Sequence, residues 1–170
     1  MKNLGGIFLK LDFEKAYDRV NWEFLWSTLL CKGFDLGVVH RIMQLVFGGQ
    51  MAIKINGKVG PYFRNARGVR QGDPLSPILF DWVVDELAMI LEKARAAGHI
   101  RGLVSHLIPG VISHLQYADD TMVLLEPDEL CIANLKFLLL SFENMSGLKI
   151  NLAKSEVVIM GVDRDRLEQQ

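Results

Sequence analysis

The sequence predicts an α+β fold of the split βαβ (ferredoxin-like) kind, in which an antiparallel sheet carries helices on one face. Two observations predict it. The elements expected from hydrophobic periodicity run strand, helix, strand, strand, helix, strand once a segment at about residues 21–67 is set aside as an inserted helical and β-hairpin segment. The chain of 170 residues, 50% of them hydrophobic, is long enough for one sizeable core and too short for two ordinary domains.

The first strand and the two helices after it follow from local signals. Residues 4–11 form a short apolar run that ends at Asp12, as expected for a buried strand whose end exposes a carboxylate. Asn21 opens a helix whose apolar side chains recur at helical spacing until Gly33. A second helix is expected over residues 36–47, where a pair of glycines stops it.

A hairpin with a basic face is expected next. The dipeptide Asn56-Gly57 is a strong signal for a two-residue turn between short strands. Basic side chains interleaved with aromatic rings suit a phosphate backbone and stacked bases, although a solvated hairpin face has the same composition. The side chains that we predict to contact nucleic acid are Lys54, Lys58, Arg64 and Arg67.

The second half of the chain supplies the remaining elements. A loop at residues 68–74 precedes a helix that should begin with Ser76 as N-cap and Pro77 at its first position. Two strands, expected at about residues 111–117 and 121–125, have only three residues between them and therefore form an antiparallel hairpin. A helix at 128–145 and a strand at 156–160 complete the order.

The carboxylates at the strand ends indicate a metal site. In a split βαβ fold the first strand lies beside the central hairpin, so Asp12 would lie near Asp119 and Asp120 at the tip of that hairpin. Three carboxylates this close repel one another unless a cation lies between them, and Mg²⁺ prefers such oxygen ligands. Two Mg²⁺ ions about 3.5–4 Å apart would stabilise both oxygens of an in-line phosphoryl displacement. An Asp-Asp pair alone is also ordinary turn chemistry.

Four motifs in order resemble the palm motifs of reverse transcriptases. They read Leu-Asp-Phe-Glu-Lys-Ala-Tyr-Asp at 11–18, Gly-Val-Arg-Gln-Gly-Asp-Pro-Leu-Ser-Pro at 68–77, Tyr-Ala-Asp-Asp at 117–120, and Gly-Leu-Lys-Ile-Asn at 147–151 followed by Lys154-Ser155. The residues within these motifs resemble those of non-LTR (LINE-type) retrotransposons of plants. The resemblance implies a single partial reverse transcriptase domain, with a polymerase palm at 1–20 and 68–161, a fingers segment at about 21–67 and a tail at 162–170.

The resemblance also implies an activity and its metal ligands. The chain would be an RNA-directed DNA polymerase, with an RNA template and a DNA primer as partners, that transfers a nucleotide from a dNTP to the primer 3′-OH. Two Mg²⁺ ions would assist, with Mn²⁺ able to substitute. Asp12, Asp119 and Asp120 would be the catalytic carboxylates and metal ligands, and the backbone carbonyl of Phe13 a further ligand.

Substrate contacts follow from the same resemblance. Tyr17 matches the position whose ring packs under the incoming sugar and disfavours a 2′-OH, although a core aromatic would also suit that place. The loop that approaches the incoming nucleotide and the template contributes Arg70, Gln71 and Gly72.

A lysine near the end of the last motif would assist the leaving group. An ammonium beside a departing pyrophosphate neutralises charge and supplies a proton, so Lys154 is expected to be the general acid. Lys149 is the alternative, and either lysine could simply be solvated beside a strand.

Other classes of protein fit less well. The two cysteines are far apart and the histidines show no paired spacing, which excludes a disulfide scaffold and a structural zinc cluster. Charged side chains interrupt the longest apolar stretches and no secretory signal is visible, so we expect an intracellular protein without a membrane contact, in the nucleus rather than the cytoplasm. A nucleotidyl cyclase would share the palm and carboxylates but leaves the loop at residues 68–77 without a purpose.

An alternative function remains open within the same resemblance. Only 11 residues precede Asp12, and about ten follow Met160, so the upstream fingers and the thumb of a reverse transcriptase are not expected in this chain. The alternative is a truncated retroelement remnant that folds but is not catalytic alone and binds nucleic acid weakly at most.

Overall fold

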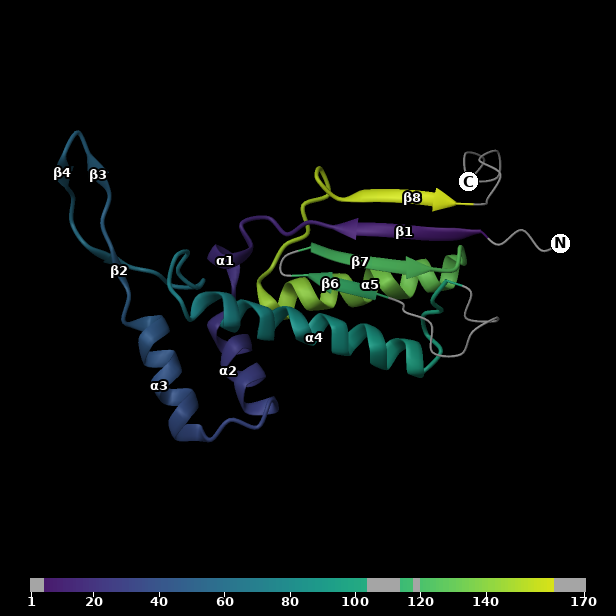
Figure 1. Ribbon diagram of the computed structural model, residues 1–170, viewed down its shortest axis with the longest axis horizontal. Helices are drawn as coiled ribbons and strands as arrows, with labels where there is room; N and C mark the ends of the chain where they lie inside the picture. Colours follow the sequence, from purple (N-terminus) through teal and green to yellow (C-terminus); the bar gives the residue numbers. More distant parts are fainter. Residues whose placement is uncertain (1–4, 104–113, 118–119, 161–170) are drawn as a thin grey trace.

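A four-stranded antiparallel sheet forms the centre of the computed structural model, which describes residues 5–103, 114–117 and 120–160 (Figure 1). The strand order is β6-β7-β1-β8. These strands are β1 (Gly6–Leu11), β6 (His114–Tyr117), β7 (Asp120–Leu125) and β8 (Glu156–Met160). The two long helices, α4 (Ser76–Ala96) and α5 (Glu129–Ser146), lie together along one face of this sheet (Figure 1). The predicted α+β architecture is confirmed.

Alternating burial along β7 shows which face of the sheet carries the helices. Thr121, Val123 and Leu125 are buried, whereas the residues between them are half-buried. Successive side chains of a strand point to opposite faces, so one face of β7 packs into the core and the other remains open. The core beneath it is completed from α4 by Leu79, Phe80, Val83, Val84, Leu87 and Leu91.

Three helices follow β1: α1 (Ala16–Arg19), α2 (Trp22–Cys31) and α3 (Leu36–Phe47). The side chain of Asn21 caps α2 by accepting hydrogen bonds from two backbone amides, and Asp35 caps α3 by accepting one from the Gly37 amide. Helix α2 packs against α3 and α4, which attaches the segment after β1 to the helical layer.

The hairpin predicted at Asn56-Gly57 is confirmed. Both turn residues have positive φ, 49° at Asn56 and 82° at Gly57, which matches the twist of a two-residue hairpin. The turn joins β3 (Lys54–Ile55) to β4 (Lys58–Val59), and β2 (Gln50–Met51) pairs with β5 (Phe63–Arg64) at the base. The hairpin stands well away from the four-stranded sheet (Figure 1).

The prediction that Ser76 caps α4 is wrong. Ser76 is the first helical residue and is buried, and Leu75 occupies the cap position without a side-chain hydrogen bond. Asp73 holds the turn before the helix, because its carboxylate accepts from the Leu75 amide at 3.0 Å and its carbonyl accepts from the Ser76 amide at 3.1 Å. Ser76 packs into the interior, and the hydrogen bonds of the preceding turn are made by Asp73, which stays near solvent.

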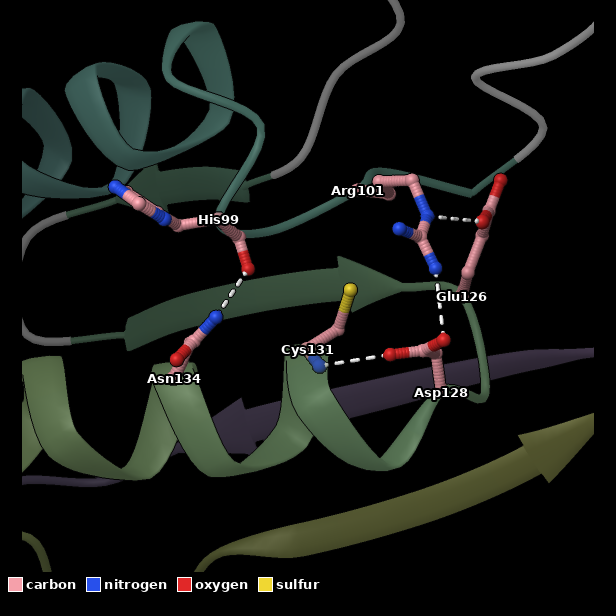
Figure 2. Close-up of polar contacts among 6 residues, drawn as sticks. All are labelled: His99, Arg101, Glu126, Asp128, Cys131 and Asn134. Carbon is pink, nitrogen blue, oxygen red and sulfur yellow. Dashed lines mark hydrogen bonds and ion pairs between the residues drawn. The ribbon is translucent and has the colours of Figure 1, made fainter.

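Arg101 ties the end of the α4 layer to the start of α5 (Figure 2). Its guanidinium donates to Glu126 at 2.9 Å and to Asp128 at 2.8 Å. Asp128 also accepts from the Cys131 amide, and this hydrogen bond, followed by the charge of Arg101, lowers the pKa of the Asp128 carboxyl. Burial raises the pKa of the Cys131 thiol, as expected for an inert core cysteine. The predicted start of the helix near residue 128 is confirmed.

The other predicted elements agree with the structure where it describes them. The helix expected over residues 36–47 and the strand expected over 156–160 have those bounds. The strand expected at 111–117 is described from His114 onward, and its first three residues lie outside the described part. No helix among the described residues is both long enough and apolar enough to cross a membrane.

Candidate active site

The end of β1 and the beginning of β7 bring Asp12 and Asp120 to the same place. In the antiparallel pairing Leu11 lies opposite Thr121, so one further step sets Asp12 opposite Asp120. Leu11 and Phe13 are buried and Asp12, between them, is half-buried. Alternation therefore directs Asp12 to the open face of the sheet, and the same argument directs Asp120 there, because Thr121 is buried. The register agrees with the predicted approach of Asp12 to the hairpin that carries Asp120. The metal-binding role of the two carboxylates stays a prediction.

Asp119 lies outside the described residues, as does Ala118. The antiparallel hairpin of β6 and β7 is confirmed. Asp120, however, was expected in the turn and is instead the first residue of β7, paired with Tyr117, so two residues rather than three separate the strands. The role predicted for Asp119 stays a prediction.

The loop after α5 is bound to the backbone that carries Asp12. The Asn151 amide donates to the Asp12 carbonyl at 2.8 Å, and the Glu14 amide donates to the Lys149 carbonyl at 2.8 Å. These two bonds flank Phe13 and Ile150, which form an antiparallel bridge without hydrogen bonds to each other. The Phe13 carbonyl therefore points away from Ile150, toward the side of β1 on which β7 lies. This orientation suits the ligand role predicted for it.

Ser155 supports Asp12 from the same loop. Its hydroxyl accepts from the Asp12 amide at 3.2 Å and donates to the Asn151 carbonyl at 2.9 Å. Lys154 precedes Ser155 in this turn and is exposed, and Lys149 is exposed as well. The structure thus keeps both lysines near the backbone of the site, and the choice of general acid stays open.

Lys10 is a part of this site that the sequence interpretation missed. Its Nζ lies 3.3 Å from Oδ1 of Asp120, with 36% of the lysine side chain and 47% of the aspartate side chain exposed. A signal was present in the sequence, because a residue two positions before Asp12 on a strand must share its face.

Tyr17 is fixed both through its ring and through its backbone carbonyl. Its ring stacks on Phe80 with the centroids 4.7 Å apart and the planes at 19°. Phe80 is fully buried, and the Tyr17 carbonyl accepts from the Val69 amide at 2.8 Å. The ring is half-buried, so it packs on the core and also keeps an exposed part, five residues after Asp12.

The two glycines of the loop at residues 68–73 serve different purposes. Gly68 has φ +85°, and a Cβ built on it would lie 2.7 Å from the Asp18 carbonyl oxygen. The Gly68 carbonyl also accepts from the Trp22 indole at 2.7 Å, so this glycine fixes the loop against α1 and α2. Gly72 has φ +86° and a Cβ there would have nothing within 4 Å. Gly72 and Gln71 are exposed, which leaves room for a ligand to approach the backbone.

Arg70 lies against the end of α3. Its guanidinium donates to the Leu45 carbonyl at 3.2 Å and lies 3.7 Å from the Asp73 carboxylate. A Cβ on Gly49 would meet the same side chain at 3.0 Å. The structure does not bring Arg70 to the carboxylates, and its predicted substrate contact stays a prediction.

The predicted nucleic-acid contacts fall in two places. Lys54, Lys58 and Arg64 are exposed on the projecting hairpin. Arg67 instead lines an open hollow of about 740 Å³ beside Arg19, where the rings of Trp22, Trp26 and Phe47 also lie. The hairpin and the hollow are both accessible, and the structure does not test which of these side chains contacts nucleic acid.

The described donor atoms fit a magnesium ion. The Asp12 carboxylate, the Asp120 carboxylate and the Phe13 carbonyl belong to neighbouring positions at the end of β1 and the start of β7, and Mg²⁺ takes oxygen ligands of this kind, completed by water and substrate phosphates. Within the described ranges no group of three His, Cys, Asp or Glu side chains could hold a metal ion, and the described residues do not include Asp119.

Together, the antiparallel sheet, the helices on one of its faces and the strand-end carboxylates on the other define a polymerase palm. The chain belongs to the reverse transcriptase family: the family model described as "Reverse transcriptase (RNA-dependent DNA polymerase)" matches residues 2–168. Within that family it is a reverse transcriptase domain of the non-LTR retrotransposon kind, as found in R2 elements.

Curated relatives support this assignment. The Pol polyprotein of the type-2 retrotransposable element R2DM of Drosophila melanogaster is 33% identical over 144 residues, which cover 85% of this chain and 13% of that protein. An R2 Pol polyprotein of Popillia japonica is 32% identical over 152 residues, 86% of this chain and 20% of that protein. An uncharacterized mitochondrial protein of Arabidopsis thaliana is 43% identical over 86 residues, 50% of this chain and 63% of that protein. The chain therefore spans a small part of the R2 proteins.

Solved structures agree on the fold. Telomerase from Candida albicans, in complex with a fragment of telomeric RNA, superposes with a TM-score of 0.70 at 16% identity, over 94% of this chain and 27% of that one. Apo telomerase from Candida tropicalis gives a TM-score of 0.69 at 16% identity, over 94% of this chain and 32% of that one.

Proposed function

We propose that the chain is the palm and part of the fingers of an RNA-directed DNA polymerase. It would transfer a nucleotide from a dNTP to the 3′-OH of a DNA primer paired with an RNA template. One observation carries the proposal: the β1–β7 register sets Asp12 opposite Asp120 on the open face of the sheet, and the Phe13 carbonyl points toward the side of β1 on which β7 lies. Membership of the reverse transcriptase family supports the choice of reaction.

The chemistry assigns a task to each part of the site. Asp12, Asp119, Asp120 and the Phe13 carbonyl would hold two Mg²⁺ ions, with Mn²⁺ able to substitute. When bound, such ions stabilise the charge on the attacking and leaving oxygens of an in-line displacement. The primer 3′-OH would lose its proton to water, its oxygen would form a bond to the α-phosphorus while the bond to pyrophosphate breaks, and Lys154 or Lys149 would give a proton to the pyrophosphate.

The remaining residues would position the substrates. Tyr17, supported by Phe80, would lie under the sugar of the incoming nucleotide. The exposed backbone at Gln71 and Gly72 would approach the nucleotide and the template, and Arg70 would act there only after leaving its contact with α3. The exposed basic side chains of the hairpin and Arg67 would contact the nucleic-acid backbone.

The proposal also covers the division of the chain into palm and fingers, the kind of element that it comes from and its location in the cell. Residues 1–20 and 68–161 would form the palm and residues 21–67 a fingers segment. The sequence identity shared with the Arabidopsis protein supports kinship with retrotransposons of plants. Copying of a genomic element supports a nuclear location.

Primer extension tests the proposed activity. The purified chain is incubated with an oligo-primed RNA template, four dNTPs and Mg²⁺, beside Asp119→Asn and a control, Asp81→Asn, in which the same change is made on the exposed surface of α4. We expect extension by the parent and the control and none by Asp119→Asn. Absence of extension by all three proteins, with circular dichroism showing that they are folded, contradicts the proposal and favours the alternative of a non-catalytic remnant. Extension by Asp119→Asn contradicts the metal site.

The choice between deoxynucleotides and ribonucleotides tests Tyr17. We expect Tyr17→Val to lower the preference for a dNTP over the matching rNTP by about 10- to 100-fold, because a small side chain leaves room for the 2′-OH. The measurement is the ratio of single-nucleotide incorporation rates with dNTP and rNTP. Tyr17→Phe keeps the ring on Phe80 and should keep the preference; an unchanged ratio in Tyr17→Val would assign the ring to the core alone.

A further inference from the structure

Lys10 places a positive charge inside the carboxylate site. It lies two residues before Asp12 on β1, and so on the same open face of the sheet. Across the sheet, Lys10 pairs in register with Met122 of β7, so Asp120 is its diagonal neighbour. The Lys10 ammonium forms an ion pair with the carboxylate of Asp120, with Nζ 3.3 Å from Oδ1.

The direction of the Lys10 side chain is not dictated by the sheet alone. Glu156 lies directly opposite Lys10 in the pairing of β1 with β8, and it is exposed. Among the described residues, however, the ion pair that Lys10 forms is the one with Asp120. The lysine thus reaches toward the hairpin that carries the predicted catalytic carboxylates and away from the edge strand.

We propose that Lys10 is a positioning residue that competes with divalent metal for the carboxylate of Asp120. This inference rests on the proposed function. A cation entering the site must share Asp120 with the ammonium or displace it, and the two positive charges repel. Lys10 therefore keeps Asp120 directed onto the open face before metal arrives, and it weakens metal binding in the absence of nucleotide.

A consequence for the reaction follows from charge. Mg²⁺ commonly arrives with the phosphates of its substrate, and the negative charge of a triphosphate offsets that of a nearby ammonium. The competition by Lys10 thus favours loading of the metal together with the dNTP over loading of the metal alone.

Binding of Mn²⁺ to the free protein, followed by electron paramagnetic resonance of the unbound ion, tests the proposal without any turnover. We expect Lys10→Met to bind Mn²⁺ about two- to fivefold more tightly than the parent, the range that an exposed ion pair supports. Lys10→Arg keeps the charge and should bind as the parent does. Lys15→Met removes an equal charge three residues after Asp12, from an exposed side chain, and its effect should be smaller.

A double-mutant cycle separates competition from a structural role. In EDTA, Lys10→Met should lower the melting temperature more in the parent than in an Asp120→Asn background. The reason is that the Asp120→Asn protein has already lost the ion pair between Lys10 and Asp120. With saturating Mn²⁺ this difference should shrink. A lysine with a structural role alone would lower the melting temperature equally with and without metal.

The outcomes are distinct for the two proposals. If the parent binds Mn²⁺ and Lys10→Met binds it equally or more weakly, the competition is contradicted while the metal site stands. If neither protein binds Mn²⁺, both the metal site and the competition are contradicted.

Discussion

Asp12→Asn is expected to reduce Mg²⁺-dependent nucleotide transfer by about 10²–10³-fold or more, the loss that follows removal of one charge-stabilising group from a reaction centre. Asparagine keeps the size of the side chain but loses the negative charge that a divalent cation needs. The fold should not change, because Asp12 is held through its backbone amide and carbonyl, which bind Ser155 and Asn151. The measurement is the rate of single-nucleotide incorporation together with Mn²⁺ binding.

Asp81→Asn serves as the matched control for this change. Asp81 lies exposed on α4, and desolvation, followed by the charge of Asp85, raises the pKa of its carboxyl. Neutralising it should affect neither metal binding nor transfer. If Asp12→Asn retained activity within tenfold of the parent while its circular dichroism was unchanged, Asp12 could not be a principal metal ligand.

The second large effect concerns stability and compares two glycines with nearly the same φ. Gly68→Ala should lower the free energy of unfolding by about 3 kcal/mol or more, because a left-handed backbone is strained for alanine and the new Cβ would lie 2.7 Å from the Asp18 carbonyl oxygen. Gly72→Ala carries the backbone strain alone, since nothing lies within 4 Å of its Cβ, and should cost about 1 kcal/mol. Urea unfolding of both variants measures the difference.

The variants Gly68→Ala and Gly72→Ala also distinguish a glycine that supports the loop from one that leaves room for the substrate. Gly72→Ala should stay folded yet extend a primer more slowly, because the methyl group occupies the open side of the loop. Equal losses of stability in the two variants would mean that the loop moves away from Asp18 at no cost, and the attachment of this loop to α1 would then be weaker than the structure indicates.

Local signals account for most of the fold that could be predicted. The helix at residues 36–47 begins after Asp35, a capping aspartate, and stops at a glycine, and both signals act within a few residues. The turn at Asn56-Gly57 requires positive φ, which these two residue types adopt most readily. Ser76 was the exception, because a serine before a proline has the same local signature whether the packing leaves it at the cap or buries it.

The candidate site shows a similar division. The approach of Asp12 to the hairpin followed from the order of the elements, since a split βαβ fold sets its first strand beside the central hairpin. The partners of individual side chains did not follow. Arg70 bonds to the end of α3 and Lys10 pairs with Asp120, and both contacts depend on segments far apart in the chain.

The type of fold, the family and the identity of the strand-end carboxylates could be read from the amino-acid sequence, because periodicity, caps, turns and motifs each lie within short stretches of residues. Three features emerge from the folded chain alone: Gly68 must be a glycine because Asp18 lies against it, the Phe13 carbonyl points away from Ile150, and Lys10 pairs with Asp120. The physical reason is that register and packing bring together atoms separated by many residues. No local pattern specifies which of several acidic or backbone groups a side chain finally meets.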